Sequence, residues 1–203
     1  MKETRCNLCG SNYYRVVYKI KGKASSDAKP EYKITEDKAD LSALRIVRCL
    51  RCGLVYVNPQ EDARSIYLRY SSMEDELYVS EEQGRRQAAR IILKSIAKYA
   101  HKGKILDIGC ATGFLLDEAK KQGWEAYGVE LSKWAANFAR DKFNLDIFEG
   151  VLKEAKLPYN YFDAIILLDS IEHLTDPRQT MEEIRRILKP TGILCISTPD
   201  FDS

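Results

Sequence analysis

Four cysteines near the N-terminus have the spacing of a metal site. They occur as two C-x-x-C pairs, each followed by a glycine, in "CNLCG" and "CLRCG". Two residues between thiolates let one tight turn present both sulfurs to a tetrahedral ion, and the glycine permits the left-handed backbone that aims N–H groups at the sulfur. Together the two turns supply the ligands of a closed structural zinc site: Cys6, Cys9, Cys49 and Cys52.

The stretch between the two pairs is long. It has 39 residues, against the usual ~15–20 of the simplest four-cysteine pattern. Two β-like runs, "YYRVVYKI" and "ALRIVRCLRCGLVYVNP", flank a polar segment at 21–40 that suits an exposed loop or hairpin tip. We therefore predict two zinc-binding turns joined by antiparallel strands. The alternatives are four unrelated cysteines or two disulfides, and the disulfides are disfavoured because "MKETRCNLCG" does not resemble a secretory signal.

The purpose of such a ribbon does not follow from its cysteines. A zinc ribbon can bind nucleic acid, a protein partner or nothing beyond its own domain. Arg45, Arg48 and Arg51 flank the second cysteine pair, but the aromatic pattern of a nucleic-acid groove does not accompany them. We interpret these arginines as a solvated face, and the sequence argues against nucleic acid as a partner.

A second group of residues with chemical potential lies in "KILDIGCATGFLL", where Asp107 closes an apolar run and Gly109 and Gly113 flank the turn that follows. A dinucleotide fingerprint would need glycines at 109, 111 and 114, and a P-loop would need Gly-Lys-Ser/Thr, so neither pattern is present. Glu130 closes the next strand, 23 residues after Asp107, where an acid suits the ribose diol of an adenosine-type ligand. The acid beside the turn suits a cation better than a pyrophosphate.

Alternating strands and helices must position these residues. We predict five strands, at 104–109, 125–131, 145–150, 162–170 and 192–199, with helices between them. This alternation implies a parallel sheet with right-handed crossovers and ligands at the carboxyl ends of the strands. The predicted fold class is α/β, a Rossmann-like parallel sheet preceded by a small β-rich zinc ribbon. The expected domains are a zinc-ribbon-like domain at 1–60, a helical connector at 61–103 and a Rossmann-like domain at 104–203.

The connector is predicted to be mainly helical. Ser80, followed by two acids, is the expected N-cap of a helix that ends near residues 102–103. The arginines of this helix, Arg85, Arg86 and Arg90, are expected to form a solvated face. The tyrosines of "YSSMEDELY" either reach a ligand cleft or pack in the core or on the surface, and we favour packing.

Composition limits the class of protein. The 203 residues are 45% hydrophobic and 31% charged, as in an ordinary soluble globular protein. A net charge of +2 gives no global field that would recruit nucleic acid or an anionic membrane. The longest apolar runs, such as "AIILL", fall far short of the ~20 residues that a membrane span needs. We expect a cytoplasmic protein without a membrane partner.

From 104 to 199 the sequence resembles the class I S-adenosylmethionine-dependent methyltransferases. The resemblance rests on an ordered series, "KILDIGCATG", "GVELS", "FDAIILLDSIEHLTDP" and "LKPTGILCISTP". It implies that S-adenosylmethionine is the cofactor, that the turn holds its methionine moiety and that Glu130 binds its ribose. The family often has an acid after the third strand for the adenine, where this chain has Val151 and Leu152. The implied cofactor-binding residues are Asp107, Gly109, Cys110, Ala111, Gly113, Glu130, Leu131, Val151, Leu152 and Asp169.

The twin-cysteine domain narrows the resemblance to enzymes such as the sugar C-methyltransferases, which act on nucleotide-linked deoxysugars. It implies a small-molecule acceptor, with His173 and Asp169 after the fourth strand as candidate catalytic residues. The alternative role for the "EH" dipeptide is to brace the loop and the cofactor edge. His101, Cys110 and Cys195 are assigned structural roles.

Two other functions stay open. In one, the ribbon docks RNA or protein and the methyltransferase half acts on that macromolecule. In the other, the Rossmann-like half binds another nucleoside ligand, such as NAD. The sheet of the family has seven strands and this chain stops after the fifth predicted one, so we expect a truncated domain that lacks much of its acceptor pocket.

Overall fold

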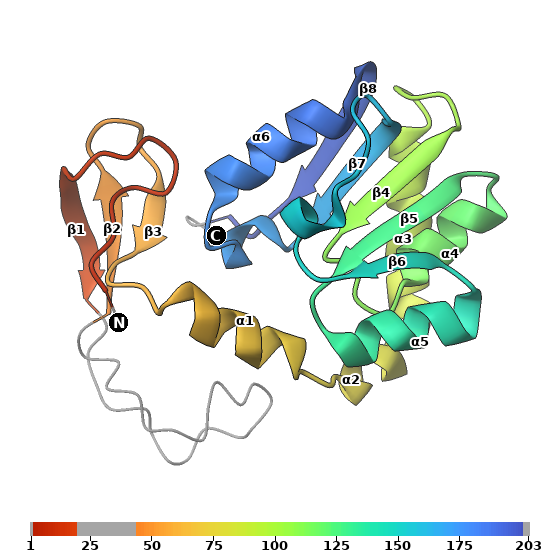
Figure 1. The fold of residues 1–203 in the computed structure, drawn as a ribbon, viewed down its shortest axis with the longest axis horizontal. Helices are drawn as coiled ribbons and strands as arrows, with labels where there is room; N and C mark the ends of the chain where they lie inside the picture. Colours follow the sequence, from red (N-terminus) through yellow and green to blue (C-terminus); the bar gives the residue numbers. More distant parts are fainter. Residues whose placement is uncertain (1, 20–43, 201–203) are drawn as a thin grey trace. The chain divides into compact units, whose positions relative to one another are not determined.

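The computed structural model describes residues 2–19 and 44–200. The chain divides into two compact units, Met1–Ser65 and Ile66–Ser203. The first contains a three-stranded antiparallel sheet and the second a five-stranded parallel sheet covered by helices (Figure 1). The predicted α/β fold class, with its small β-rich N-terminal part, is confirmed. The predicted loop at 21–40 lies outside the described residues.

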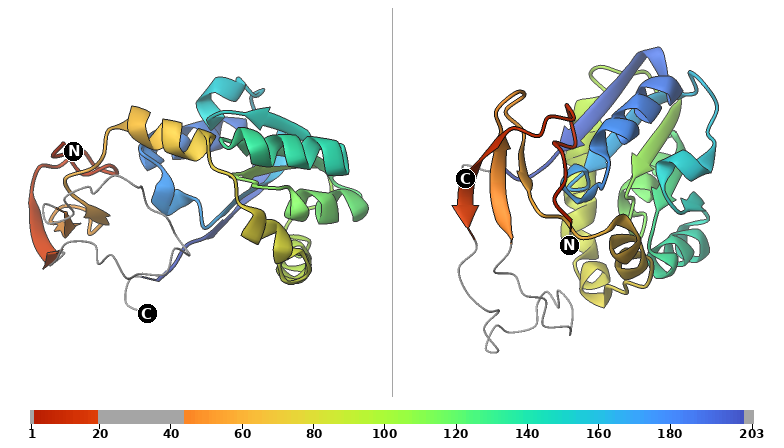
Figure 2. Two further views of the ribbon diagram at one scale, coloured as in Figure 1. Left: turned by 90° about the horizontal axis from the view of Figure 1, so that it is seen from below. Right: turned by 60° about the vertical axis from the view of Figure 1, so that its left-hand side comes forward.

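The first unit contains the strands β1 (Tyr14–Lys19), β2 (Arg45–Cys49) and β3 (Val55–Val57). They lie side by side in the order β1-β2-β3 (Figures 1 and 2). The central strand contributes the fully buried Val47 to a small core with Cys6, Cys49 and Tyr56. Among the described residues this core is very small, and apolar burial on this scale does not stabilise a domain without a further cross-link.

Three helices precede the parallel sheet: α1 (Ala63–Ser71), α2 (Glu76–Ser80) and α3 (Glu82–Ile96). The predicted helix cap at Ser80 is wrong, because Ser80 ends α2 and its hydroxyl donates to the Leu77 carbonyl at 2.7 Å. Asp75 is the cap that forms here, and its carboxylate accepts from the Tyr78 N–H at 2.8 Å. None of the helices in the described part of the chain is long and apolar enough to cross a membrane.

The second unit contains the strands β4 (Lys104–Ile108), β5 (Glu125–Glu130), β6 (Asp146–Glu149), β7 (Phe162–Leu168) and β8 (Leu188–Ser197). All are parallel, in the order β6-β5-β4-β7-β8 (Figure 1). The chain runs outward from β4 to β6 and then returns to place β7 beside β4. In open sheets of this kind, ligands bind at the carboxyl ends of the strands that flank such a switch point.

Helices cover both faces of this sheet. Besides α3 they are α4 (Phe114–Lys121), α5 (Lys133–Phe143) and α6 (Pro177–Ile187). Ile105 and Ile166 point into a core formed with α3, α4 and α5, whereas their neighbours Leu106 and Ile165 point into a second core with α6. In Figure 1, α6 lies in front of β7 and β8, and α3 and α4 lie behind β4 and β5. Burial on both faces explains the near-continuous apolar run of β7.

A buried ionic cluster joins α3 to α4. The Arg86 guanidinium donates to Asp117 at 2.6 Å and to Glu118 at 2.8 Å, and the three side chains are between 6% and 13% exposed. Arg90, itself 61% exposed, donates to Glu118 at 2.8 Å. The predicted solvated face is therefore wrong for Arg86, whose charge is compensated inside the protein.

Candidate functional site

The turn after β4 requires glycine for two reasons. Gly109 and Gly113 both have φ of +79°, a left-handed conformation that other residues rarely adopt. A Cβ at Gly109 would lie 2.6 Å from Ser170 Oγ, and a Cβ at Gly113 would lie 2.7 Å from Leu145 Cδ1. The absence of side chains from these two positions therefore leaves room for neighbouring parts of the protein.

Glu130 joins the end of β5 to this turn. Its Oε2 accepts from the Ala111 N–H at 2.8 Å, and its Oε1 accepts from the Ser132 N–H at 2.7 Å. Ala111 has φ of +46°, so the carboxylate holds a non-glycine residue in the left-handed region. Burial raises the pKa of Glu130. The carboxylate thus lies against the glycine turn.

Asp107 is a buried carboxylate at the carboxyl end of β4. It is 5% exposed, and no hydrogen bond to its side chain occurs in the described ranges 2–19 and 44–200. Burial raises its pKa to about 7, and the nearby charge of Glu130 adds to the effect. Strongly shifted carboxylates at the carboxyl ends of strands are typical of functional sites. A cation placed beside Asp107 would stabilise its ionised form.

The end of β7 supplies Asp169 and His173, the two candidate catalytic residues. Asp169 has φ of +47°, its N–H donates to the Ser197 carbonyl at 2.9 Å, and its carboxylate accepts from the Ser197 hydroxyl at 3.2 Å. His173 lies in the short helical turn Ile171–His173 and is exposed. Its Nδ1 is 3.0 Å from the Tyr70 hydroxyl. Both side chains lie at the carboxyl edge of the sheet, as do Asp107 and Glu130.

The other predicted cofactor residues differ in how accessible they are. Leu131 is half-buried after β5, and Val151 is 39% exposed after β6. Leu152 is 5% exposed because it packs in the core beside α6. Cys110 is buried in the glycine turn, and burial raises the pKa of its thiol well above the ordinary range. The thiol therefore stays neutral, in keeping with the structural role assigned to it.

Ser132, at the same edge, was not singled out from the sequence, whereas Tyr70 and Tyr78 were expected to pack in the core or on the surface. The Ser132 hydroxyl caps α5 by accepting from the Ala135 N–H at 3.1 Å and donates to the Met73 carbonyl at 2.7 Å. Burial raises the pKa of Tyr78 to about 12. Its ring lies under the Arg85 guanidinium, 3.4 Å from the ring centroid. The two tyrosines of "YSSMEDELY" were the signal that the sequence offered. Their spacing alone did not show that this segment contacts residues that follow the parallel strands.

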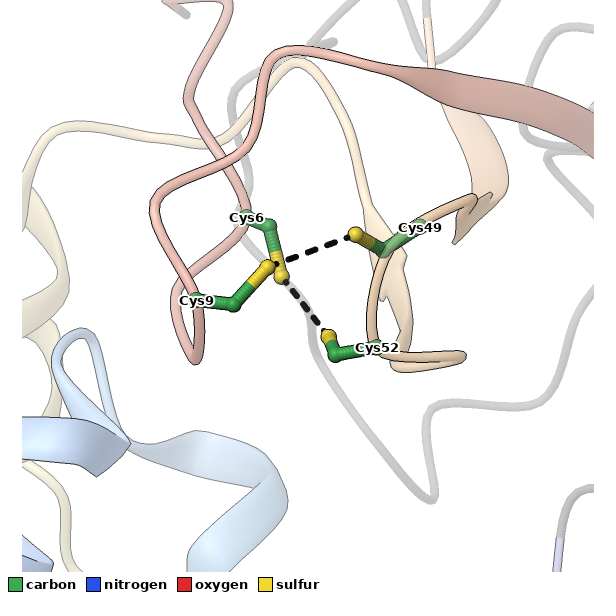
Figure 3. A group of neighbouring side chains, drawn as sticks. All are labelled: Cys6, Cys9, Cys49 and Cys52. Carbon is green, nitrogen blue, oxygen red and sulfur yellow. Dashed lines mark hydrogen bonds between the residues drawn. The ribbon is translucent and has the colours of Figure 1, made fainter.

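The four predicted metal ligands come together in the first unit (Figure 3). All four sulfurs lie within 4.8 Å of one another, with Cys6 Sγ 3.5 Å from Cys52 Sγ and Cys9 Sγ 3.6 Å from Cys49 Sγ. A tetrahedral ion with Zn–S bonds of about 2.3 Å would set its sulfurs about 3.8 Å apart. The cysteines are free thiols, so the disulfide alternative is not what the structure contains.

The two cysteine turns have the same backbone pattern. In the first, the Cys6 N–H donates to Ser11 and the Gly10 N–H donates to Cys6, both at 2.9 Å. In the second, the equivalent bonds run from Cys49 to Leu54 and from Gly53 to Cys49, at 2.8 and 3.1 Å. Backbone N–H groups, that of Cys52 foremost, lower the pKa of the Cys49 thiol to about 6. The two turns therefore present their sulfurs from the same backbone geometry.

Comparison with known proteins agrees with this geometry. A family model described as a methyltransferase domain matches residues 80–203. The chain is similar to the ubiquinone biosynthesis O-methyltransferase of Histophilus somni, with 30% identity over 105 residues that cover 47% of this chain and 44% of that protein. The chain spans less than half the length of the curated relatives that it matches.

Solved structures show the same fold. A crystal structure of a SAM-dependent methyltransferase from Archaeoglobus fulgidus aligns with a TM-score of 0.53 and 25% identity, covering 64% of this chain and 61% of that chain. The Haemonchus contortus phosphoethanolamine N-methyltransferase 2, in complex with phosphomonomethylethanolamine and S-adenosylhomocysteine, aligns with a TM-score of 0.50 and 26% identity. That alignment covers 54% of this chain and 27% of that chain.

Proposed function

The chain belongs to the methyltransferase domain family, and from this premise we propose that it transfers the methyl group of S-adenosylmethionine to a small-molecule acceptor. The observation that carries the proposal is the buried carboxylate of Asp107 at the carboxyl end of the central strand β4, which has no hydrogen-bond partner among residues 2–19 and 44–200. An ionised carboxylate in such surroundings is costly unless a cation joins it. The ammonium and the sulfonium of S-adenosylmethionine are cations of that kind.

The other contacts of the cofactor come from the turn and the neighbouring strand ends. The main chain from Gly109 through Cys110 and Ala111 to Gly113 would hold the methionine moiety. Glu130 would accept from the ribose hydroxyls, since an ionised carboxylate has about four lone-pair sites and those of Glu130 also face the turn through Ala111 and Ser132. For the adenine, the half-buried Leu131 and the exposed Val151 provide apolar contact, and the buried Leu152 supports them from the core.

Catalysis in this proposal is mainly alignment. When bound, S-adenosylmethionine supplies a methyl group on a positively charged sulfur, so an aligned acceptor needs little further activation. A carbon or hydroxyl acceptor must also lose a proton, and His173 and Asp169 are the groups of this chain proposed to take it. Two hydrogen bonds with Ser197, one donated by the Asp169 N–H and one accepted by its carboxylate, fix Asp169 against the end of β8.

The names of the relatives support a small-molecule acceptor, since they include a ubiquinone biosynthesis O-methyltransferase and a phosphoethanolamine N-methyltransferase. The combination of a four-cysteine ribbon with a methyltransferase domain supports a more specific proposal, in which the acceptor is a nucleotide-linked sugar.

One observation favours the alternative function, in which a macromolecule docks on the ribbon: Arg15 and Arg48 are directly opposite each other across β1 and β2. Like charges in such a pair are destabilising without an anion. A steep salt dependence of RNA affinity would support that alternative.

For the ribbon, we propose that the four cysteines hold one structural Zn²⁺. The support is the closed set of four sulfur ligands, since sites that leave no position open are structural and not catalytic. The ion would cross-link two turns that the small core of Val47 and Tyr56 does not hold together by itself.

The cofactor assignment is tested with Glu130→Ala. We expect this variant to bind S-adenosylhomocysteine at least about 100-fold more weakly than wild type in titration calorimetry, because two hydrogen bonds to a charged group are lost. Glu125→Ala is the matched control, since Glu125 begins the same strand, pairs with Lys104 and is exposed. Equal affinities in the two variants would contradict the assignment. NAD at the same concentration should leave the melting temperature unchanged.

The raised pKa of Asp107 predicts a pH dependence of binding. Its pKa is about 7 in the ligand-free protein, and a bound cation lowers it again. Binding below pH 7 therefore releases a proton, and affinity is lost as the pH falls through about 7. We expect S-adenosylhomocysteine to bind about tenfold more weakly at pH 6 than at pH 8. Asp107→Asn should bind weakly at both values, and a wild-type affinity that is equal at pH 6 and 8 would refute the prediction.

A further inference from the structure

We propose that Tyr70 is a positioning residue that holds the His173 imidazole with its proton on Nδ1, so that Nε2 is free to take a proton from the acceptor. The inference rests on the proposed methyl transfer and adds a residue to that site. Tyr70 lies on α1 and His173 follows β7, with a separation of 103 residues in sequence.

The contact between the two side chains is a single hydrogen bond. Tyr70 Oη lies 3.0 Å from His173 Nδ1, and the ring centroids are 5.8 Å apart with the planes inclined by 52°, so the rings do not stack. Burial raises the pKa of Tyr70, which keeps the hydroxyl neutral, and its oxygen can accept from an Nδ1–H. His173 is exposed, and within the described residues its ring makes no other hydrogen bond. Nε2 is thus open to a ligand.

The segment that follows Tyr70 fixes it over the carboxyl edge of the sheet. The Met73 carbonyl accepts from the Ser132 hydroxyl at 2.7 Å, just after β5. The Tyr78 ring stacks on Phe114, the first residue of α4, with centroids 6.1 Å apart and planes inclined by 6°. The run from Tyr70 to Tyr78 is therefore tied to residues that follow β4, β5 and β7. A side chain supported in this way restrains the residue that it contacts.

The tautomer decides what His173 can do. If Nδ1 carries the proton and donates it to Tyr70 Oη, Nε2 has a lone pair and acts as a base; the opposite tautomer makes Nε2 a donor. In the proposed step, a lone pair of the acceptor forms a bond to the methyl carbon, and the electrons of the broken S–C bond stay on sulfur. The acceptor proton passes to Nε2, and the imidazolium keeps its Nδ1–H bond to Tyr70.

The test is ¹⁵N-histidine NMR on the full chain, which has only two histidines. His101→Gln assigns the two signals, and spectra recorded above the titration range report the tautomer of each ring. We expect His173 to be protonated at Nδ1 in wild type and to lose that preference in Tyr70→Phe. Tyr67→Phe is the control, because Tyr67 lies on the same helix and is 39% exposed.

Two outcomes would overturn the inference: a wild-type His173 protonated at Nε2, or a tautomer that is unchanged in Tyr70→Phe. The first outcome is measured on the wild-type protein, so it does not depend on whether a variant folds. The proposed function is tested separately by S-adenosylhomocysteine calorimetry, in which Tyr70→Phe should bind like wild type. If the wild-type protein does not bind S-adenosylhomocysteine, the methyltransferase proposal is refuted. If it binds normally but His173 is protonated at Nε2, only the role of Tyr70 is refuted.

Discussion

Arg86→Met is expected to lower the free energy of unfolding of the second unit by about 3 kcal/mol in urea denaturation. The substitution leaves Asp117 and Glu118 buried without their shared guanidinium, and removing one member of a buried ion pair costs about 3–5 kcal/mol. The lower end applies because Lys121 still contacts Asp117 at 2.7 Å and Arg90 still contacts Glu118 at 2.8 Å.

The matched control for this substitution is Arg178→Met on α6. Arg178 pairs with Glu182 at 3.0 Å, but the two side chains are 61% and 64% exposed, so the loss should be below about 0.5 kcal/mol. If both variants lost a similar free energy of unfolding, burial of the Arg86 cluster would make no contribution to stability. The two tryptophans, Trp124 and Trp134, belong to the second unit, and their fluorescence follows its unfolding.

Cys49→Ser is expected to remove the metal and unfold the first unit while the second stays folded. Metal analysis should give about one zinc per wild-type chain and little for the variant, because a site with three sulfurs and a hydroxyl binds Zn²⁺ far more weakly. Limited proteolysis should then cleave within the first 65 residues, since the core around Val47 is too small to hold them. Tryptophan fluorescence should hardly change.

The control for the zinc prediction is Cys195→Ser in β8, which makes the same chemical change at a half-buried cysteine outside the cluster. It should keep its zinc. If Cys49→Ser retained a full equivalent of zinc, or if its first unit resisted protease as the wild type does, the proposed structural role of the ion would be wrong.

Much of the architecture was predictable because it depends on local patterns. Strand and helix alternate with a regular spacing, and that spacing determines a parallel sheet with Asp107 and Glu130 at its carboxyl edge. The two C-x-x-C-G motifs specify their turns almost completely, since Gly10 and Gly53 both adopt the left-handed conformation, with φ of +72° and +80°. The conformation of such a short turn depends on its own residues and not on distant parts of the chain.

The sequence was less informative where two distant segments meet. Nothing next to Arg86 shows that Asp117 and Glu118 will face it, so its burial was missed. Tyr70 looked like a packing residue because its partner, His173, is 103 positions away. Ser80 has the composition of a helix cap, but Asp75 caps the preceding helix and α2 runs through Ser80. At Arg86 and Tyr70 tertiary contacts override local preference, whereas at Ser80 a competing local cap, Asp75, decides where the helix begins.

The bonds from Glu130 to Ala111 and Ser132 have a kinetic consequence. They hold the glycine turn in one conformation without any ligand, so the proposed cofactor would not have to order this turn when it binds. Its entropic penalty on association is correspondingly small. Differences in affinity among related ligands should then arise mainly from how fast they leave.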